Sequence, residues 1–389
     1  MANSNLTSAK KAKNDEFYTQ YHDIEKEINA YLEFNPDVFR GKTVLLPCDD
    51  PEWSNFTKFF AQNFERFGLK KLISTSYAPD SKKYKSVYQP TLFEANDPQF
   101  DEYKTVKKGK LFTLTRDKSG DGKVDVDDLE WHYLEDDGDF KSDEIKKLRD
   151  EADIIITNPP FSLFREFLAW IVEADKRFVI IGSKNAITYK EIFPLIKGNE
   201  MWVGTTSFNK DMLFISPEKI DPSQKPSSAT RTVDGIVYLR SPSVWFTNID
   251  HGRRHQPLPL MTMEDNLKYS KHKEIKGRKA YDEYDNYDAI EVPFTDAIPS
   301  DFDGVMGVPI SFLDKYSPEQ FEIVGMCENE DLYNYKTQVY TTAECKNAYL
   351  AKFGKNGTYD LNASGVIIRD GLFEKVYQRV LIKHKEIAK

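Results

Sequence analysis

The sequence predicts an α/β protein whose larger domain is built on a largely parallel sheet with helices on both faces. Two strand–helix–strand units, over residues 43–77 and 153–183, carry this prediction. In each unit a short apolar run ends in a turn that contains proline, and an amphipathic helix and a second apolar run follow. A helical crossover joins parallel strands, so both turns are expected at the carboxyl ends of the strands, where such sheets bind ligands.

The first unit begins with a strand over residues 43–46 and the turn Pro47-Cys48-Asp49-Asp50-Pro51. Phenylalanines then recur at helical spacing over residues 56–67 until Gly68 ends the helix, and a strand over 71–77 completes the unit. Before it, apolar residues predict a helix around 24–32, and residues 1–13 are predicted to form a flexible basic tail.

The second unit begins with a strand over residues 153–157 and continues through the turn Asn158-Pro159-Pro160-Phe161 into a helix with an apolar face. A strand over 177–183, a helix over 188–197 and strands over 201–205 and 244–249 extend the pattern. Residues 78–138 are polar and too numerous for a simple loop, which predicts an inserted hairpin region. Residues 251–389 follow an irregular pattern and predict a second, mixed domain.

Length and composition narrow the class of protein. The chain has 389 residues, 40% of them hydrophobic, which suits two domains with a buried core. No apolar run approaches the roughly 18 to 20 residues of a membrane span, and the polar N-terminus lacks the apolar core of a signal peptide. Three widely spaced cysteines do not suit a disulfide scaffold. These features favour a reducing cytoplasm and no membrane attachment.

The net charge of −9 is unevenly distributed along the chain. Acidic residues dominate residues 115–153, whereas residues 250–280 carry an excess of lysine and arginine. A polyanion could dock on the second segment, and two solvated faces of opposite charge are the alternative.

The turn at residues 158–161 is the most informative feature of the sequence. Proline restricts the residue before it to extended conformations, so Asn158 is expected to leave the strand with its side chain beyond the sheet edge. Its side-chain oxygen and the carbonyls of the turn could accept two hydrogen bonds from one planar amino group, while Phe161 stacks on the heterocycle that carries this group. The structural alternative is a stiff turn before a helix capped by Ser162.

This set of groups suits the methylation of an exocyclic amine. The nitrogen is a poor nucleophile because its lone pair is delocalised into the ring. Two acceptors that hold its N–H bonds out of plane return the lone pair to the nitrogen and stabilise the positive charge that develops on it. Asn158 is neutral at every relevant pH, so its predicted role is that of an acceptor and not of a general base.

At this point the chain resembles the EcoRI-type adenine-specific DNA methyltransferases, which use S-adenosylmethionine. The likeness rests on seven segments in one order, which are DEFYTQYHDIE at 15–25, CDDPEWSNFTKFFAQNF with GLKKLI at 48–73, GDFKSDE at 138–144, ITNPPFSLFREFL at 156–168, ITYKEIF at 187–193, YDNYDAI at 284–290 and DGVMGVPISFL at 303–313. The resemblance implies a Rossmann-like class I methyltransferase sheet over residues 14–250 and a smaller mixed C-terminal recognition region over 251–389. It also implies double-stranded DNA as substrate and a restriction endonuclease that acts on the same site without binding this chain.

The resemblance assigns cofactor contacts by position. Phe17, Tyr18 and Thr19, together with Cys48, Asp49, Asp50, Pro51, Ser54 and Asn55, match elements around the methionine part of S-adenosylmethionine, and Asp139 and Phe140 match the pair at its adenine. Two carboxylates, Asp49 and Asp50, stand where glycines are usual, so contact there is expected through acceptance from the cofactor's ammonium group. No acidic residue ends the second strand to bind the ribose.

A base inside a duplex must be rotated out of the stack before its amine can react, and Phe161 is expected to receive it. Asn158, where some relatives have serine, favours adenine over cytosine in this family. Arg253, Arg254 and His255 are the candidates for contacts to phosphate or bases, with plain surface charge as the alternative. The same turn occurs in methyltransferases of RNA adenine and of a protein glutamine amide, and an inactive nucleic-acid binder of the same fold is a further alternative.

Residues 117–128 have the oxygen spacing of a calcium loop, with Gly122 at its sixth position. Asp128 stands where the bidentate glutamate is usual, and a strand is predicted before the loop. An acidic hairpin turn is therefore favoured over calcium, and no metal is predicted.

Overall fold

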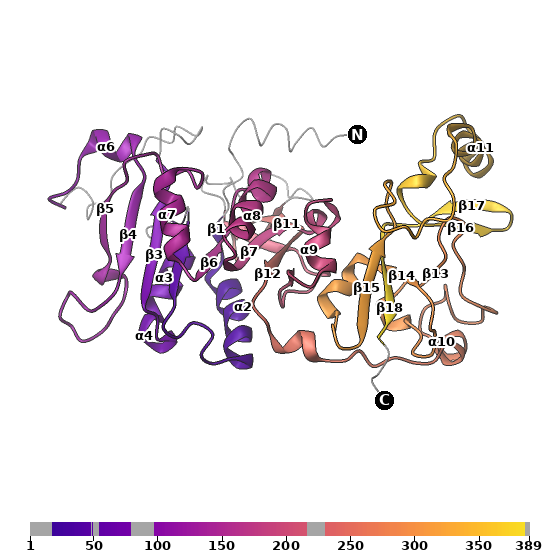
Figure 1. The fold of residues 1–389 in the computed structure, drawn as a ribbon, viewed down its shortest axis with the longest axis horizontal. Coiled ribbons are helices and arrows are strands. Elements are labelled where there is room, and N and C mark those ends of the chain that lie inside the picture. Colours follow the sequence, from indigo (N-terminus) through magenta and orange to yellow (C-terminus); the bar gives the residue numbers. More distant parts are fainter. Residues whose placement is uncertain (1–17, 48, 50–53, 79–96, 216–229, 386–389) are drawn as a thin grey trace. The chain divides into compact units, whose positions relative to one another are not determined.

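The computed structural model describes residues 18–47, 49, 54–78, 97–215 and 230–385 (Figure 1). Within these ranges the chain divides by its contacts into two compact units, unit 1 over Met1–Gly252 and unit 2 over Arg253–Lys389. The protein is of the mixed α/β type with several sheets. The predicted tail at residues 1–13 lies outside the described residues. The roles predicted for residues 14–250 and 251–389 stay predictions.

The main sheet of unit 1 has the strand order β5-β4-β3-β2-β6-β7-β12-β8. Its strands are β2 (Thr43–Leu46), β3 (Lys71–Ser76), β4 (Lys110–Leu114), β5 (Glu130–Tyr133), β6 (Ile154–Thr157), β7 (Arg177–Ser183), β8 (Trp202–Val203) and β12 (Ser243–Thr247). The four central strands, β3, β2, β6 and β7, are parallel, as the two strand–helix–strand units require. Their side chains are almost all buried because helices cover both faces.

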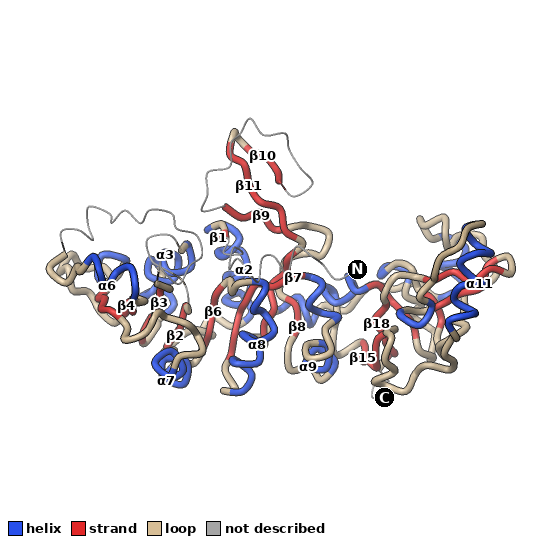
Figure 2. Tube along the Cα trace, turned by 90° about the horizontal axis from the view of Figure 1, so that it is seen from above, coloured by secondary structure: helices blue, strands red, loops and turns tan. Residues whose placement is uncertain are grey.

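The helices of unit 1 pack on opposite faces of this sheet. They are α2 (Tyr21–Phe34), α3 (Asn55–Gln62), α4 (Phe64–Phe67), α6 (Glu102–Lys107), α7 (Asp143–Glu151), α8 (Phe164–Glu173) and α9 (Phe193–Lys197). Figure 2 shows α3 on one side of the sheet and α7 and α8 on the other. Ile28 and Phe59 pack in one core with Val44 and Ile156, whose neighbours along the strands face the other side. Gly68 ends α4 in the left-handed conformation, at φ +62°.

A second sheet in unit 1 was not predicted. It has the order β1-β9-β11-β10, formed by β1 (Tyr18–Thr19), β9 (Met212–Ile215), β11 (Ile236–Ser241) and β10 (Thr230–Val233), and every pairing is antiparallel. Figure 2 shows β9, β10 and β11 extending away from the main sheet. We call these four strands the small sheet.

Two expectations for unit 1 differ from the structure. The run at 244–249 forms β12, which lies antiparallel to β7, so the main sheet is mixed towards both edges. The helix expected over 188–197 is divided into a 3-10 helix, Lys184–Thr188, and α9, because Pro194 suits only the first turn of a helix. The described part of residues 78–138 forms α6, β4 and β5, and β4 and β5 pair antiparallel, as in the predicted hairpin, and join the main sheet through β3.

Unit 2 contains a four-stranded sheet and a separate hairpin. The sheet has the order β13-β14-β18-β15, with β13 (Ile290–Glu291), β14 (Met306–Pro309), β18 (Arg379–His384) and β15 (Phe321–Met326). The hairpin pairs β16 (Val366–Arg369) with β17 (Leu372–Lys375), and the helices are α10 (Met263–Tyr269) and α11 (Thr342–Phe353). Glu291 and Arg379 form a buried ion pair in which Arg379 Nη2 lies 2.6 Å from Glu291 Oε1.

No helix in the described ranges of either unit has the length and apolar character needed to cross a membrane.

Candidate active site

The turn at residues 158–161 emerges at the carboxyl end of β6 and is not sealed in the core. Asn158, Pro160 and Phe161 are partly exposed, and only Pro159 is buried. Thr157, the last residue of β6, donates a hydrogen bond of 2.9 Å from Oγ1 to the carbonyl of Pro47 at the end of β2. This bond holds the two predicted turns side by side on adjacent parallel strands.

The end of β2 is a polar site built around Asp49. This residue is buried, and its Oδ1 accepts a hydrogen bond of 2.8 Å from Ser54 Oγ. Its main-chain carbonyl accepts from Thr57 Oγ1, at 3.0 Å, and from the hydroxyl of Ser74 on β3. Ser54 also caps α3 through the amide of Phe56, so the carboxylate is positioned by the first turn of that helix. Cys48, Asp50 and Pro51 lie outside the described residues.

The N-terminal contact predicted for the cofactor lies against the same helix. Tyr18 and Thr19 form β1, and the carbonyl of Thr19 accepts a hydrogen bond of 2.8 Å from Asn55 Nδ2. Thr19 is buried, and its side-chain oxygen has no hydrogen-bond partner among the residues that the structure describes. A buried hydroxyl without a hydrogen bond lowers the stability of the fold, and a ligand that forms a hydrogen bond with it would remove this cost. Phe17 lies outside the described residues.

A glycine brings Asp139 to the end of β3. Gly138 has φ +87°, and a Cβ atom there would lie 2.4 Å from the carbonyl oxygen of Ser76. The loop is fixed further by a hydrogen bond of 2.8 Å from the amide of Ala78 to the carbonyl of Asp137. Asp139 is therefore held at the same edge of the sheet as Asp49, and its side chain is partly exposed.

Phe140 lies beneath this loop. It is 4% exposed, and its ring packs edge-on against Phe167 and Trp170 of α8, with centroids 5.1 and 5.7 Å away. The ring thus ties the Asp139 loop to the helix that follows the 158–161 turn. Its stacking on a cofactor stays a prediction.

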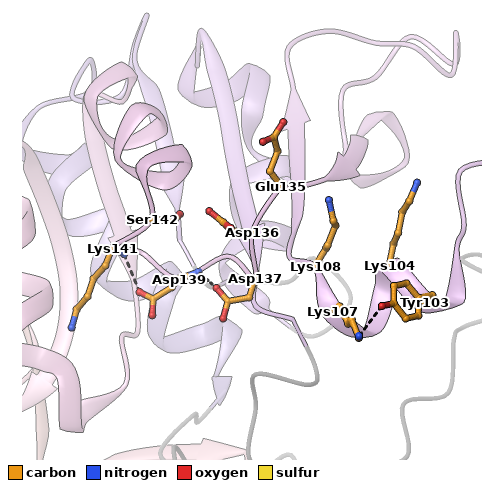
Figure 3. Close-up of a pocket in the computed structure, with 10 residues that line it drawn as sticks. All are labelled: Tyr103, Lys104, Lys107, Lys108, Glu135, Asp136, Asp137, Asp139, Lys141 and Ser142. Carbon is orange, nitrogen blue, oxygen red and sulfur yellow. Dashed lines mark hydrogen bonds between the residues drawn. The ribbon is translucent and has the colours of Figure 1, made fainter.

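A cavity of about 520 Å³ opens beside Asp139 (Figure 3). Its walls come from α6 and from the 135–142 loop, and its other lining residues are Tyr103, Lys104, Lys107, Lys108, Glu135, Asp136, Asp137, Lys141 and Ser142. Figure 3 shows Lys107 of α6 directed toward Tyr103, to which its Nζ donates a hydrogen bond of 2.8 Å. Neither the 158–161 turn nor Thr19 lines this cavity, so it adjoins only the Asp139 end of the site.

Two residues near the candidate site, Phe214 on the small sheet and Lys184 just after β7, were not predicted from the sequence. Phe214 of β9 packs edge-on against Phe161, with ring centroids 6.2 Å apart. Lys184, directly after β7, donates from Nζ to the carbonyls of Phe208 and Lys210 and to Asp211 Oδ1. The dipeptide Asp234-Gly235 between alternating apolar residues is a hairpin signal that could have revealed β10 and β11.

The three residues predicted to contact DNA are engaged inside unit 2. Arg253 Nη2 lies 3.4 Å from Asp314 Oδ2, His255 Nδ1 lies 2.7 Å from Glu319 Oε1, and Arg254 is buried. Exposed cations of the same unit occur further along the chain, at Lys268, Lys271, Lys273, Lys276 and Lys279. Contact of the first three residues with DNA stays a prediction.

The acidic loop at residues 117–128 uses its carboxylates on its own main chain. Asp128 accepts from the amides of Lys118, Ser119 and Asp125, and Asp117 accepts from those of Gly120 and Gly122. The bonds from Ser119, Lys118 and Asp125 lower the pKa of Asp128 to about 2. No group of three or more potential metal ligands occurs among the described residues.

The mixed α/β fold, with a partly exposed Asn-Pro-Pro-Phe turn next to the polar residues around Asp49, is consistent with a methyltransferase. The comparisons agree, since residues 5–385 match the family model described as adenine-specific methyltransferase EcoRI. The chain therefore belongs to the EcoRI family of adenine-specific methyltransferases, and it is a site-specific DNA adenine methyltransferase.

Three curated relatives support this membership. The chain is 41% identical to the type II methyltransferase M.EcoRI of Escherichia coli over 331 residues, which cover 85% of this chain and 91% of the relative. It is 34% identical to M.MpnI of Mycoplasma pneumoniae, over 85% and 89% of the two chains. It is 32% identical to M.MgeORF184P of Mycoplasma genitalium, over 97% and 98%. No solved structure matches the chain significantly.

Proposed function

We propose that the chain transfers a methyl group from S-adenosylmethionine to the exocyclic amino group of adenine in a specific double-stranded DNA sequence. The adenine is rotated out of the duplex to reach the 158–161 turn. The observation that carries this proposal is the position of that turn, partly exposed and joined by the Thr157–Pro47 hydrogen bond to the polar end of β2. A restriction endonuclease of the same sequence specificity, acting without contact with this chain, is part of the proposal.

The strand order supports a Rossmann-like sheet. From β2 the chain moves outward to β3 and later returns to β6 on the other side of β2. The order therefore reverses between β2 and β6, and sheets of this kind bind ligands in the crevice at that reversal. The Pro47 and Asn158 turns stand at this point. We infer that unit 2 is the smaller recognition region.

The residues at the reversal fit the proposed cofactor. S-adenosylmethionine, when bound, supplies an electrophilic methyl group on a sulfonium. The buried carboxylate of Asp49 suits an ammonium group, and the unsatisfied hydroxyl of Thr19 suits the polar amino-acid part of such a ligand. We infer that Asp139, whose loop approaches the end of β3, accepts from the exocyclic amine of the cofactor's base.

The chain's own contribution to chemistry is positioning and charge stabilisation. The Asn158 side-chain oxygen and a carbonyl of the turn accept the two N–H bonds of the target amine. As the nitrogen–carbon bond would form and the bond from the methyl carbon to sulfur would break, leaving a neutral thioether, these acceptors stabilise the positive charge on the nitrogen until one of its protons passes to water. Loss of one preorganised hydrogen-bond partner of a transition state typically costs about 100- to 1,000-fold in rate. Phe161 is held against Phe214 and offers its ring to the extruded base.

The test is incubation of the protein with labelled S-adenosylmethionine and duplex DNA, RNA or protein. We expect label in adenine of duplex DNA only. Asn158→Ala should lower the rate at least about 100-fold while cofactor affinity, measured by calorimetry, changes less than twofold. Asn347→Ala, at an exposed position of α11, is the matched control and should act as the wild type. Label in RNA or protein alone would overturn the proposal.

A further inference from the structure

The small sheet has two different faces. Strand register places Phe214 opposite Leu239 and Met212 opposite Ser241, and Met212, Phe214 and Leu239 pack on the core of unit 1. Because side chains alternate along a strand, their neighbours must face the other way. The opposite face therefore carries Tyr18, Leu213, Ile215, Arg231, Val233, Ile236, Tyr238 and Arg240. We call this set the outer face.

The outer face combines apolar exposure with positive charge. Ile236 is 53% exposed and Ile215 is 40% exposed, and the arginines at 231 and 240 are exposed as well. The four strands of the small sheet contain no acidic residue. The charged residues that the four strands place on this apolar face are both arginines, which suits a polyanion that also offers flat apolar surface, such as the sugars and bases of nucleic acid.

The small sheet is joined to the candidate active site. Its inner residue Phe214 packs on Phe161, and its strand β1 carries Thr19 directly opposite Phe214. Its base is fixed by an ion-pair network, in which Asp211 lies 3.1 Å from Lys184 Nζ and 2.6 Å from Arg240 Nε. Burial raises the pKa of Asp211, but hydrogen bonds from these two cations outweigh burial and keep its pKa below the usual value. The Asp211 carboxylate is therefore ionised at neutral pH.

The far end of the small sheet is a narrow ribbon. β10 and β11 are joined by Asp234 and Gly235, both in the left-handed region at φ 49° and 79°, as in a tight two-residue turn. Ile236 is the first residue after that turn. A two-stranded ribbon of this width fits the major groove of DNA, and apolar side chains can wedge between base steps.

We propose that the outer face of the small sheet binds the DNA duplex beside the extruded adenine. Arg231 contacts the phosphate backbone, and Ile236 at the tip packs against the bases or sugars next to the target. Because the base of the sheet touches Phe161, a duplex bound here has its target within reach of the 158–161 turn. This proposal rests on the proposed function, since it requires duplex DNA as the substrate.

The experiment compares two variants of the outer face with two matched controls. Arg231→Glu and Ile236→Asp change the outer face. Lys70→Glu changes an exposed cation at the amino end of β3, whereas the candidate site lies at the carboxyl ends of the parallel strands. Val172→Asp changes an apolar residue of unit 1 that is 39% exposed in the last turn of α8.

Affinity is measured by fluorescence anisotropy on a duplex that contains a sequence found to be methylated by the wild type. Both outer-face variants should bind this duplex about tenfold or more weakly, and both controls should stay within twofold. Arg231→Glu should also lower the slope of log affinity against log salt by about 1, the value for one lost phosphate contact. Cofactor affinity by calorimetry should be unchanged in all four, which shows that the variants are folded.

A fluorescent adenine analogue at the target position reports extrusion, and Ile236→Asp should reduce its signal at saturating protein. If the outer-face variants bind DNA like the wild type, or the controls lose as much affinity as they do, the proposal is wrong. If the wild type methylates no duplex DNA, the proposed function fails instead.

Discussion

Gly138 offers the sharpest test of how the site is assembled, because one added methyl group would separate the Asp139 loop from β3. At φ +87°, an alanine would pay about 1–2 kcal/mol for the left-handed conformation. Its Cβ would also lie 2.4 Å from the Ser76 carbonyl, and relieving such overpacking costs roughly 1–3 kcal/mol more. We therefore expect Gly138→Ala to destabilise the protein by roughly 2–5 kcal/mol.

The matched control is Gly120→Ala. Gly120 has a similar φ of +79°, but nothing lies within 4 Å of an added Cβ. This variant should lose only the conformational part, about 1–2 kcal/mol. Unfolding in urea gives the two stability losses, and calorimetry gives the affinity for S-adenosylmethionine.

The affinity separates a local effect on the site from a general loss of stability. Gly138→Ala should bind the cofactor at least about tenfold more weakly, a loss of about 1.4 kcal/mol, because Asp139 is displaced. Gly120→Ala should bind it like the wild type. Equal stability losses in the two variants, with unchanged cofactor affinity in both, would refute the role given to the close approach of Gly138 and Ser76.

Three further predictions concern other parts of the chain. The pKa of Asp128 is about 2 in the folded protein and 3.8 ordinarily, so the ionised carboxylate stabilises the fold above about pH 4 and this stabilisation is lost as the pH falls towards 2. In urea unfolding, the difference in stability between the wild type and Asp128→Asn should therefore shrink between about pH 4 and pH 2. Arg379→Met leaves Glu291 buried without its partner and should lower the free energy of unfolding by about 3–5 kcal/mol. The double variant Arg379→Met with Glu291→Leu should recover most of this stability, and equal losses in the single and the double variant would contradict the prediction. Lys273→Glu with Lys276→Glu should reduce the salt dependence of DNA binding if unit 2 contacts phosphates, and an unchanged slope would argue against that role.

The central part of the fold could be predicted because its signals are local. The apolar runs that form β2, β6 and β7 are bounded by turn residues and separated by amphipathic helices. The direction of a strand within the sheet is harder to predict from local sequence. The run that forms β12 is as apolar as its neighbours, and nothing within it reveals that it pairs antiparallel with β7.

The small sheet was missed because most of its pairing is not local. β1 is only two residues long, and its partner β9 lies near residue 212, so neither segment shows the alternation of a longer strand. In the candidate site, the sequence motif predicted Asn158 and its turn. A motif does not predict contacts between distant residues, such as the ion pairs of Arg253 and His255 or the close approach of Gly138 to the Ser76 carbonyl that positions the Asp139 loop.

The hydrogen bond between Thr157 and Pro47 spans 110 residues, and the side chain of Gln20 bonds to the carbonyl of Leu213 across 193 residues. Contacts so distant along the chain form late in folding, since the loops between them must close first. A nascent polypeptide on the ribosome thus acquires its Asn-Pro-Pro-Phe turn long before β9 exists to pair with β1. Fragments released before about residue 241 therefore lack a complete β11 and cannot form the whole small sheet.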